Sequence, residues 1–325
     1  MITVGILGAG GMGNVHARHY RRMRDVEVFF FDPDQGQTET FIERHQVGAA
    51  PSADDLIARC DVIDICLPTP LHPSLGLRAI AAGKAVFIEK PLAGSLEDGV
   101  RLVEAADRAG VTLMPGHVVR FFPEYAAGRR LVEKGAVGTP AAARTRRGGG
   151  TPKGNDGWFM DHSRSGGVLI DLAIHDFDWL RWTLGEVKHL YSRSVGAKTG
   201  QGPDYALTTL TFESGCVAHV ESTWMDPGGG RATYEVCGNA GMIQYDSRNT
   251  QTLKTTHGSG KFINEAPLFG SDDPYYNELR GFIDAVVKHE TPPVNGHDGL
   301  MALSIALAAR ESALTDKVVA PARQF

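Results

Sequence analysis

The stretch "ITVGILGAGGMGNVHARHYRRMRDVEVFFFD", residues 2–32, combines an apolar run, a glycine-rich turn, a helical stretch and a second apolar run. Within it Gly8, Gly10 and Gly13 have the spacing G-x-G-x-x-G. In a dinucleotide-binding turn the first glycine makes the tight bend, the second lets the backbone approach the pyrophosphate, and the third packs the helix on the strand. The stretch therefore predicts the first βαβ unit of a nucleotide-binding domain.

The turn and the end of the second strand predict the cofactor contacts. The backbone N–H groups of Gly11 and Met12 are expected to face phosphates at the helix start. The second strand ends in Asp32, 19 positions after Gly13, where an acid accepts hydrogen bonds from the ribose hydroxyls of the adenosine half. Its carboxylate would repel a 2′-phosphate, so NAD is predicted in preference to NADP. The alternative is that Asp32 only begins a turn.

The spacing of apolar residues along the chain predicts two domains. Short apolar runs alternate with helical stretches up to residue 114, as in a buried parallel sheet, and they span residues 2–7, 27–31, 62–67, 85–88 and 111–114. From about residue 139, segments such as "DYALTTLTF" alternate at period two and are joined by short turns, as in antiparallel hairpins. We predict an α/β protein with an N-terminal Rossmann domain (1–118) and a C-terminal α+β domain (119–325) that has a large, mainly antiparallel open sheet.

Composition narrows the class of partner. The chain has 325 residues, of which 42% are hydrophobic, and this is enough apolar material for two cores. Its net charge of -5 gives no sign of the basic surface that binds nucleic acid. Its four cysteines lack C-x-x-C spacing, so no structural metal site is predicted. The sequence has neither a signal-peptide pattern nor an apolar run of membrane-spanning length, so a soluble, cytoplasmic protein that does not bind a membrane is expected. A small-molecule partner is favoured.

The segment "SGGVLIDLAIHDFDWL", residues 165–180, is predicted to form one helix that carries both core and site residues. At 100° per residue, Asp171, His175 and Asp178 would lie within roughly 60° of one another, opposite an apolar face. One face would pack into the core and the other would look into a cleft. Asp178 is expected to bond a neighbouring arginine or backbone group, and Asp176 to lie at the edge of the apolar arc.

The segments "LPTPLHPSLGLRAIAAGKAVFIEKP" (67–91), 165–180 and "YYNELRGFIDAVVKHETPPV" (275–294) carry a family resemblance. With the glycine turn they make the chain strongly resemble, over essentially its whole length, the Gfo/Idh/MocA oxidoreductases, the family of glucose-fructose oxidoreductase and inositol dehydrogenase. The resemblance includes the Glu-Lys-Pro element at Glu89 and Lys90, and the Asp-x-x-x-His element at Asp171 and His175. It implies a homodimer or homotetramer, formed through the broad face of the antiparallel sheet.

One part of the family pattern differs in this chain. Many members have Thr-Pro-Asn-x-x-His after the third predicted strand of the Rossmann domain, which here is the apolar run 62–67. This chain has Leu67, Pro68 and Thr69 there, followed by His72. One polar contact to the cofactor is therefore expected to be missing or replaced. The cofactor contacts implied by the resemblance are Leu67, Pro68, Thr69, His72, Glu89 and Lys90.

The chemistry expected of these residues is the oxidation of a secondary alcohol. A hydride leaves carbon while a proton leaves oxygen, and His175 is predicted to take that proton because its ordinary pKa of about 6.5 suits transfer near neutrality. Asp171 is expected to orient it or to bind a substrate hydroxyl, and Lys90 to polarise the substrate oxygen. The alternatives are a solvated lysine and a purely structural Asp171–His175 pair. A metal face is disfavoured, because no cysteine or second histidine shares it.

Two further segments are expected to border the substrate. The loop before residue 165 contains Trp158, which could stack on the C–H face of a sugar ring. The alternative is a surface turn anchored by that tryptophan. "GHVVRFFP", residues 116–123, resembles the family's crossover between domains, where His117 and Arg120 are expected to line the cleft together with Lys90, Asp171 and His175.

These features predict an NAD-dependent oxidoreductase that acts on a secondary hydroxyl or ketone of a sugar, cyclitol or sugar derivative. A second hypothesis is an NAD-dependent glycoside hydrolase that oxidises, eliminates and re-reduces its substrate. A third is a ligand-sensing regulator that keeps the fold without the chemistry. Loss of the lysine or the histidine would favour the regulator, and both residues are present.

Overall fold

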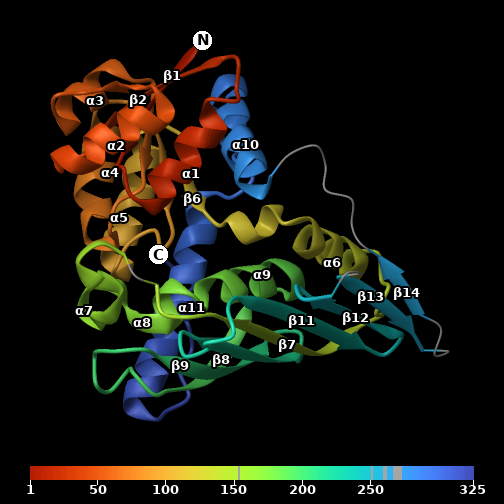
Figure 1. Ribbon diagram of the computed structural model, residues 1–325. Coiled ribbons are helices and arrows are strands. Elements are labelled where there is room, and N and C mark those ends of the chain that lie inside the picture. Colours follow the sequence, from red (N-terminus) through yellow and green to blue (C-terminus); the bar gives the residue numbers. More distant parts are fainter. Residues whose placement is uncertain (153, 250–251, 259–261, 266–272) are drawn as a thin grey trace. The chain divides into compact units, whose positions relative to one another are not determined.

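The computed structural model describes residues 1–152, 154–249, 252–258, 262–265 and 273–325 (Figure 1). The chain forms two compact units, one made of residues 1–118 and 272–300 and the other of residues 119–271 and 301–325. The sequence analysis assigns residues 272–300 to the second domain, because they follow it in the chain. In the structure they belong to the first unit.

Helix α10, Pro274–Lys288, is the reason for this difference. It packs against α1, Gly11–Tyr20, where the ring of Tyr275 stacks on that of His19 with centroids 6.4 Å apart. At its middle, the Arg280 guanidinium donates to the carboxylate of Asp25 at 2.9 Å. These contacts join segments more than 250 residues apart, a pairing that local sequence patterns do not encode.

The first unit contains a parallel sheet. Its strands, in the order β3-β2-β1-β4-β5-β6, have every neighbouring pair parallel. They are β1 (Ile2–Leu7), β2 (Val26–Phe31), β3 (Gly48–Ala49), β4 (Val62–Ile65), β5 (Ala85–Glu89) and β6 (Leu113–Gly116). This is the strand order of a Rossmann domain, which confirms the predicted N-terminal fold. The sequence analysis missed β3, which is only two residues long, and began the last strand two residues too early.

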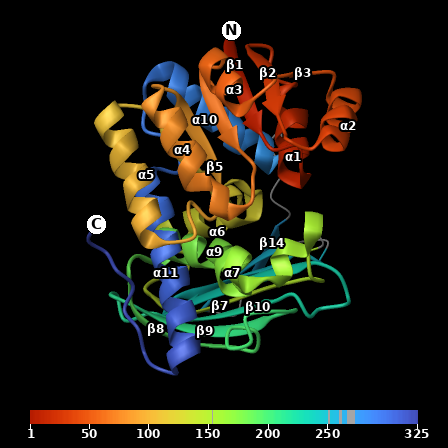
Figure 2. The same ribbon diagram turned by 90° about the vertical axis from the view of Figure 1, so that its left-hand side faces the viewer.

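Helices cover both faces of this sheet. They are α1, α2 (Gln35–His45), α3 (Ala53–Arg59), α4 (His72–Ala81), α5 (Leu96–Ala109) and α10, with a 3-10 turn η1 at Thr69–Leu71. Side chains of β5 alternate between the faces: Phe87 contacts the rings of His16 in α1 and Phe282 in α10. Ile88 points to the other face, toward Gly76 in α4, and α4 and α5 lie side by side there (Figure 2).

The second unit contains a larger sheet. Among the described residues it has eight strands in the order β14-β13-β12-β11-β7-β10-β9-β8. They are β7 (Pro140–Gly148), β8 (Val187–Ser194), β9 (Tyr205–Phe212), β10 (Val217–Thr223), β11 (Arg231–Gly238), β12 (Gly241–Asp246), β13 (Leu253–His257) and β14 (Phe262–Glu265). Only β7 and β10 pair in parallel within this described sheet, and the other neighbours are antiparallel. The predicted mainly antiparallel sheet is confirmed.

The helices of the second unit include α6, α8 and α9, which lie over one face of this sheet (Figure 1). The elements are η2 (Val118–Phe121, which begins at the last residue of the first unit), α6 (Pro123–Glu133), η3 (Asn155–Met160), α7 (His162–Ser165), α8 (Gly167–Asp171) and α9 (Ile174–Leu184). Tyr125, Trp179 and Tyr234 form an aromatic centre of the core between helices and sheet. On the opposite face Tyr191 and Leu207 are exposed.

Helix α11, Gly296–Thr315, has 20 residues. Its Ser304 and Ser312 hydroxyls donate to the carbonyls of Ala322 and Lys317, which fixes the chain end against the helix. None of the helices in the described parts of the chain has the combination of length and apolarity needed to span a bilayer.

The segment 165–180 is not one helix, contrary to the sequence prediction. Gly166 and Gly167 have φ of 78° and 70°, and the helix that follows, α8, begins only at Gly167. Helix α8 ends at Asp171 and α9 begins at Ile174. Between them the N–H of Ala173 bonds the Val168 carbonyl five residues back. The apolar spacing continues across this break, which explains why it escapes sequence patterns.

Candidate active site

The glycine turn of the first unit has the geometry that its spacing predicts. Gly8 has a φ of 106°, and a Cβ there would meet the Cys66 carbonyl oxygen at 2.7 Å. A Cβ on Gly13 would lie 1.9 Å from the carbonyl oxygen of Gly8. Gly8 and Gly13 are therefore required by the turn itself, because the backbone of α1 and the loop approach too closely for any side chain.

The start of α1 is open. A Cβ on Gly10 or Gly11 would meet no described atom within 4 Å. The N-cap Gly10 provides no side-chain hydrogen bond to the first turn, so the amides of Gly11 and Met12 are not satisfied by a capping side chain. An uncapped helix N-terminus with space beside it suits an anionic pyrophosphate. The residues present fit a dinucleotide.

Asp32 follows β2 and lies beside this turn. Its Oδ2 accepts the N–H of Ala9 at 2.8 Å, and its Oδ1 accepts the N–H of Asp34 at 2.9 Å. Half-buried and held by two backbone amides, the carboxylate is fixed next to the glycine loop. The structure thus brings together the turn and the acid that the sequence predicts as cofactor contacts.

The turn after β4 is tied to the segment after β5 through His72. The ring of His72 is 1% exposed, with Nδ1 2.9 Å from the Pro91 carbonyl oxygen and Nε2 2.7 Å from that of Leu67. Thr69 is also buried, whereas Leu67 and Pro68 are half-buried. His72 ties the segment of Leu67 to Pro91 through these two bonds, and its predicted contact with the cofactor stays a prediction.

Glu89 ends β5 and is also engaged within the protein. Its Oε1 lies 3.2 Å from His16 Nε2, and its Oε2 accepts the backbone N–H of Lys90 at 3.0 Å. Burial raises the pKa of Glu89, but the hydrogen bond and charge of His16 and the charge of Lys90 outweigh it, so the pKa is lowered. The carboxylate is therefore ionised and belongs to the support of Lys90, which is itself half-buried.

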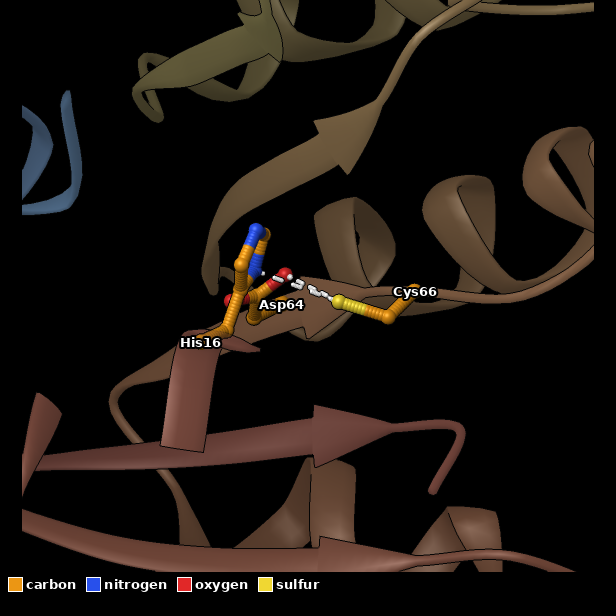
Figure 3. A group of neighbouring side chains, drawn as sticks. All are labelled: His16, Asp64 and Cys66. Atoms are coloured by element: carbon orange, nitrogen blue, oxygen red, sulfur yellow. Dashed lines mark hydrogen bonds and ion pairs between the residues drawn. The ribbon is translucent and has the colours of Figure 1, made fainter. Parts of the chain in front are cut away.

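His16 belongs to a buried group that the sequence analysis missed. Its ring and the side chains of Asp64 and Cys66 point toward one another (Figure 3). His16 Nδ1 lies 2.8 Å from Asp64 Oδ2 and 3.2 Å from Cys66 Sγ. The available signal was a charged residue, Asp64, inside the apolar strand "VIDI". The spacing of 48 residues between His16 and Asp64 hid their contact.

The second unit holds Asp171 and His175 at the junction of α8 and α9. Asp171 is the last residue of α8 and is 7% exposed. His175 is in the first turn of α9, is half-buried, and its N–H bonds the Leu172 carbonyl. Because the helix is interrupted between the two residues, their relation is not the simple i, i+4 geometry that the sequence predicts.

Two carboxylates that follow His175 in α9 each pair with an arginine. Asp176 is fully buried, and its Oδ2 accepts from Arg147 Nε at 2.8 Å. Asp178 accepts from Nε and Nη2 of Arg120, at 2.8 and 2.6 Å. The prediction that Asp178 bonds a neighbouring arginine or backbone group is confirmed, and the partner is an arginine. Asp176, predicted at the edge of the apolar arc, lies fully inside the core.

The remaining residues predicted on the substrate side occupy different environments. His117 and Arg120 are only 1% and 5% exposed. The Arg120 guanidinium forms an ion pair with Asp178 within the second unit. Trp158 in η3 is half-buried, with its ring centroid 4.1 Å from that of Phe159. Of these three, Trp158 is the most accessible to a ligand.

Family comparisons agree with both halves of the chain. Residues 2–117 match the oxidoreductase family with an NAD-binding Rossmann fold, and residues 125–244 match the GFO/IDH/MocA C-terminal domain. The first unit is thus an NAD-binding domain, and Gly8, Gly13 and Asp32 lie in its matched region.

Individual relatives cover nearly the whole chain. An uncharacterized oxidoreductase, YrbE, of Bacillus subtilis is 31% identical over 96% of this chain and 94% of its own. The myo-inositol 2-dehydrogenase of Thermotoga maritima is 29% identical over 96% of each. The fold matches that of levoglucosan dehydrogenase in complex with NADH and levoglucosan, with a TM-score of 0.88, 22% identity and coverage of 98% and 99%. The chain belongs to the GFO/IDH/MocA family of NAD-binding oxidoreductases.

Proposed function

We propose that this protein is a dehydrogenase, or a reductase in the other direction, for a secondary hydroxyl of a sugar, cyclitol or sugar derivative, with NAD as its cofactor. The observation that carries the proposal is the open, uncapped start of α1 with Asp32 fixed beside it. The name of the inositol-oxidising relative supports a polyol substrate.

The reaction needs a proton acceptor and a group that stabilises charge on the substrate oxygen. Held at the start of α1 and by Asp32, NAD would supply an acceptor for the hydride of the carbon. His175 takes the hydroxyl proton, since neutral imidazole is the side-chain base best suited to neutral pH. Lys90 stabilises the developing negative charge on the oxygen. Asp171, at the end of α8, orients His175 or accepts a hydrogen bond from a substrate hydroxyl.

The preference for NAD over NADP rests on Asp32. A carboxylate at the end of the second strand accepts hydrogen bonds from the ribose hydroxyls and repels a 2′-phosphate. The two backbone amides that hold Asp32 keep its charge at this place.

Trp158 is our candidate for the wall of the substrate pocket. Its half-buried ring lies on Phe159, which holds it in place. Such a fixed ring suits the C–H face of a sugar or cyclitol.

The protein is further proposed to form a homodimer or homotetramer through the open face of the second unit's sheet. Tyr191 and Leu207 are exposed there, at 37% and 45%. Beside them lie arginine–carboxylate pairs such as Arg146 with Glu221 and Arg231 with Asp246. Sedimentation of the wild type and of a Leu207→Glu variant tests this: the variant should dissociate, and a monomeric wild type would refute it.

The function is tested with a panel of cyclitols, aldoses and glycosides, offered with NAD+ or NADP+, while the absorbance of the reduced cofactor is followed. We expect NADH to accumulate with at least one polyol or free sugar. Cleavage of a glycoside without net NADH would instead establish the hydrolytic cycle. Binding of NADH without turnover of any compound would favour a sensing role.

A further inference from the structure

The buried group around His16 reaches the support of Lys90. His16 comes from α1, Asp64 from β4 and Cys66 from the residue after β4 (Figure 3). Glu89 comes from the end of β5. Asp64 Oδ2 lies 2.8 Å from His16 Nδ1, and Glu89 Oε1 forms an ion pair of 3.2 Å with His16 Nε2. The imidazole therefore has a carboxylate at each of its two nitrogens. All of these residues belong to the first unit.

This environment holds His16 as a cation. Burial by itself lowers the pKa of His16, but the charge of Asp64, the contact with Cys66 and the hydrogen bonds outweigh burial, and the pKa is raised well above 6.5. Burial raises the pKa of the Cys66 thiol, so Cys66 is neutral and donates to Asp64 Oδ1 at 3.3 Å. His16, Asp64 and Cys66 also place potential metal-ligand atoms within 4.8 Å of one another. Because each nitrogen of the His16 ring faces a carboxylate, we interpret the group as a charge network.

Glu89 connects this network to Lys90. The backbone N–H of Lys90 donates to Glu89 Oε2 at 3.0 Å. The Glu89 carboxylate therefore holds the main chain at Lys90, from which the lysine side chain extends. The positive charges of His16 and Lys90 both act on Glu89. If His16 lost its charge, Glu89 would keep a buried negative charge, and the ammonium group of Lys90 is the other cation that could compensate it.

We propose that His16 is a positioning residue for Lys90: its positive charge neutralises Glu89 and so keeps the Lys90 ammonium available to the substrate oxygen. This role rests on the proposed function of Lys90. It also links α1, whose first turn we assign to the cofactor pyrophosphate, with the group that polarises the substrate. His16 itself has no exposed surface, so we assign it a positioning role without contact to substrate or cofactor.

Single and double substitutions at His16 and Glu89 distinguish a role of the His16 charge from a purely structural role. His16→Gln removes the cation and leaves Glu89 charged, so kcat should fall by about 10- to 100-fold, as expected for a displaced catalytic group. The KM for NAD should change by less than about threefold, because the helix start is intact. Adding Glu89→Gln removes the excess negative charge, so the double variant should be more active than His16→Gln alone. A purely structural role for His16 predicts the opposite, since a second buried change would add damage.

A second readout does not depend on turnover. Isotope-labelled reductive methylation gives each lysine amine its own NMR signal, and Lys90→Arg assigns that of Lys90. We expect the Lys90 signal to shift in His16→Gln and to return toward its wild-type position in the double variant. Glu89→Gln alone should move it in the opposite direction, which gives a test even if His16→Gln does not fold. Arg18→Gln is the matched control, because it removes an exposed cation from the same helix and should leave the signal unchanged.

The two readouts separate failure of this proposal from failure of the proposed function. If no panel compound is oxidised but the Lys90 signal follows the expected pattern, the charge network stands and the dehydrogenase assignment falls. If a substrate is oxidised but the Lys90 signal is unmoved in both His16→Gln and Glu89→Gln, the positioning role is wrong. A double variant less active than both single variants also overturns it.

Discussion

The Arg147 guanidinium binds both carboxylate oxygens of Asp176, with Nε 2.8 Å from Oδ2 and Nη2 3.2 Å from Oδ1. The same Nη2 donates to the Tyr125 hydroxyl at 2.9 Å. Asp176 is fully buried and is the residue after His175. The pair joins the end of β7 to the first turn of α9 and thereby fixes the helix that carries the proposed base.

Replacement of Asp176 by Asn should destabilise the protein strongly. It leaves the half-buried guanidinium of Arg147 without the counter-charge of the fully buried Asp176, so the free energy of unfolding should fall by about 3 kcal/mol. Denaturant unfolding measures this. The control is Glu104→Gln in the exposed Arg108–Glu104 pair of α5, which should cost less than about 0.5 kcal/mol. Equal losses in the two variants would contradict the structural role given to Arg147 and Asp176.

His175→Ala should abolish most activity while the cofactor still binds. Loss of a general base typically lowers kcat by about 10²–10⁴-fold, and the site proposed for the dinucleotide lies in the other unit. Steady-state rates with a panel substrate, together with NADH titration by fluorescence, measure both quantities. His257→Ala, an exposed histidine at the end of β13, serves as the control. Full activity of His175→Ala would exclude it as the base.

Two glycines of the same turn should respond in opposite ways to alanine. At Gly13 a Cβ would collide with the Gly8 carbonyl oxygen at 1.9 Å, so Gly13→Ala should cost about 2 kcal/mol or more of folding stability. At Gly10 a Cβ meets no described atom within 4 Å, so Gly10→Ala should leave the melting temperature nearly unchanged. It should nevertheless weaken NADH binding by about tenfold or more, because the methyl group enters the space assigned to the pyrophosphate. Unchanged NADH affinity in Gly10→Ala would refute that location.

Asp32→Asn should reduce the discrimination against NADP. The amide keeps an oxygen for the Ala9 N–H but loses the charge that repels a 2′-phosphate, so the ratio of the Kd values for NADP and NAD should fall by about tenfold. Competition titrations with both cofactors measure it. Glu27→Gln changes an exposed carboxylate on the same strand and should not alter the ratio. If Asp32→Asn behaves like Glu27→Gln, the preference has another source.

The sequence predicts those parts of the fold that depend on local patterns. The glycine turn is an example, because the atoms that leave no room for a side chain at Gly8 and Gly13 lie within a few residues or just after the adjacent strand. The two sheets follow from continuous and alternating apolar runs. What escaped prediction depends on distant or weak signals: β3 has only two residues, and the place of α10 depends on its contacts with α1.

The site shows the same division. Asp178 was expected to bond an arginine and does, because a buried carboxylate on a helix needs a partner. The break between Asp171 and His175 was missed, because apolar residues continue through the two residues that separate α8 from α9. The network of His16 was missed because His16, Asp64 and Glu89 come from three separate elements, and only the parallel sheet brings them together.

Because the pKa of His16 is raised in the folded protein, the free energy of unfolding should fall as the pH rises above 6.5. Burial opposes the charged form, but Asp64 and the neighbouring hydrogen bonds outweigh it, so the folded protein holds this proton more tightly than the unfolded chain does. The resulting stabilisation is complete below the ordinary value of 6.5 and is lost as the pH rises through the folded-state pKa. Glu89, whose pKa is lowered, contributes above its ordinary 4.5 and loses its contribution as the pH falls.

The difference between wild type and His16→Gln isolates this contribution, since His72, whose pKa burial lowers, is common to both proteins. Denaturant unfolding at a series of pH values above 6.5 should show the wild-type advantage shrinking as the pH rises. Tyr20 and Tyr275, which also lie near His16, have raised pKa values and remain neutral through most of that series. A constant difference at every pH would mean that His16 stabilises the fold by packing alone. The charge on which the positioning of Lys90 depends would then be absent.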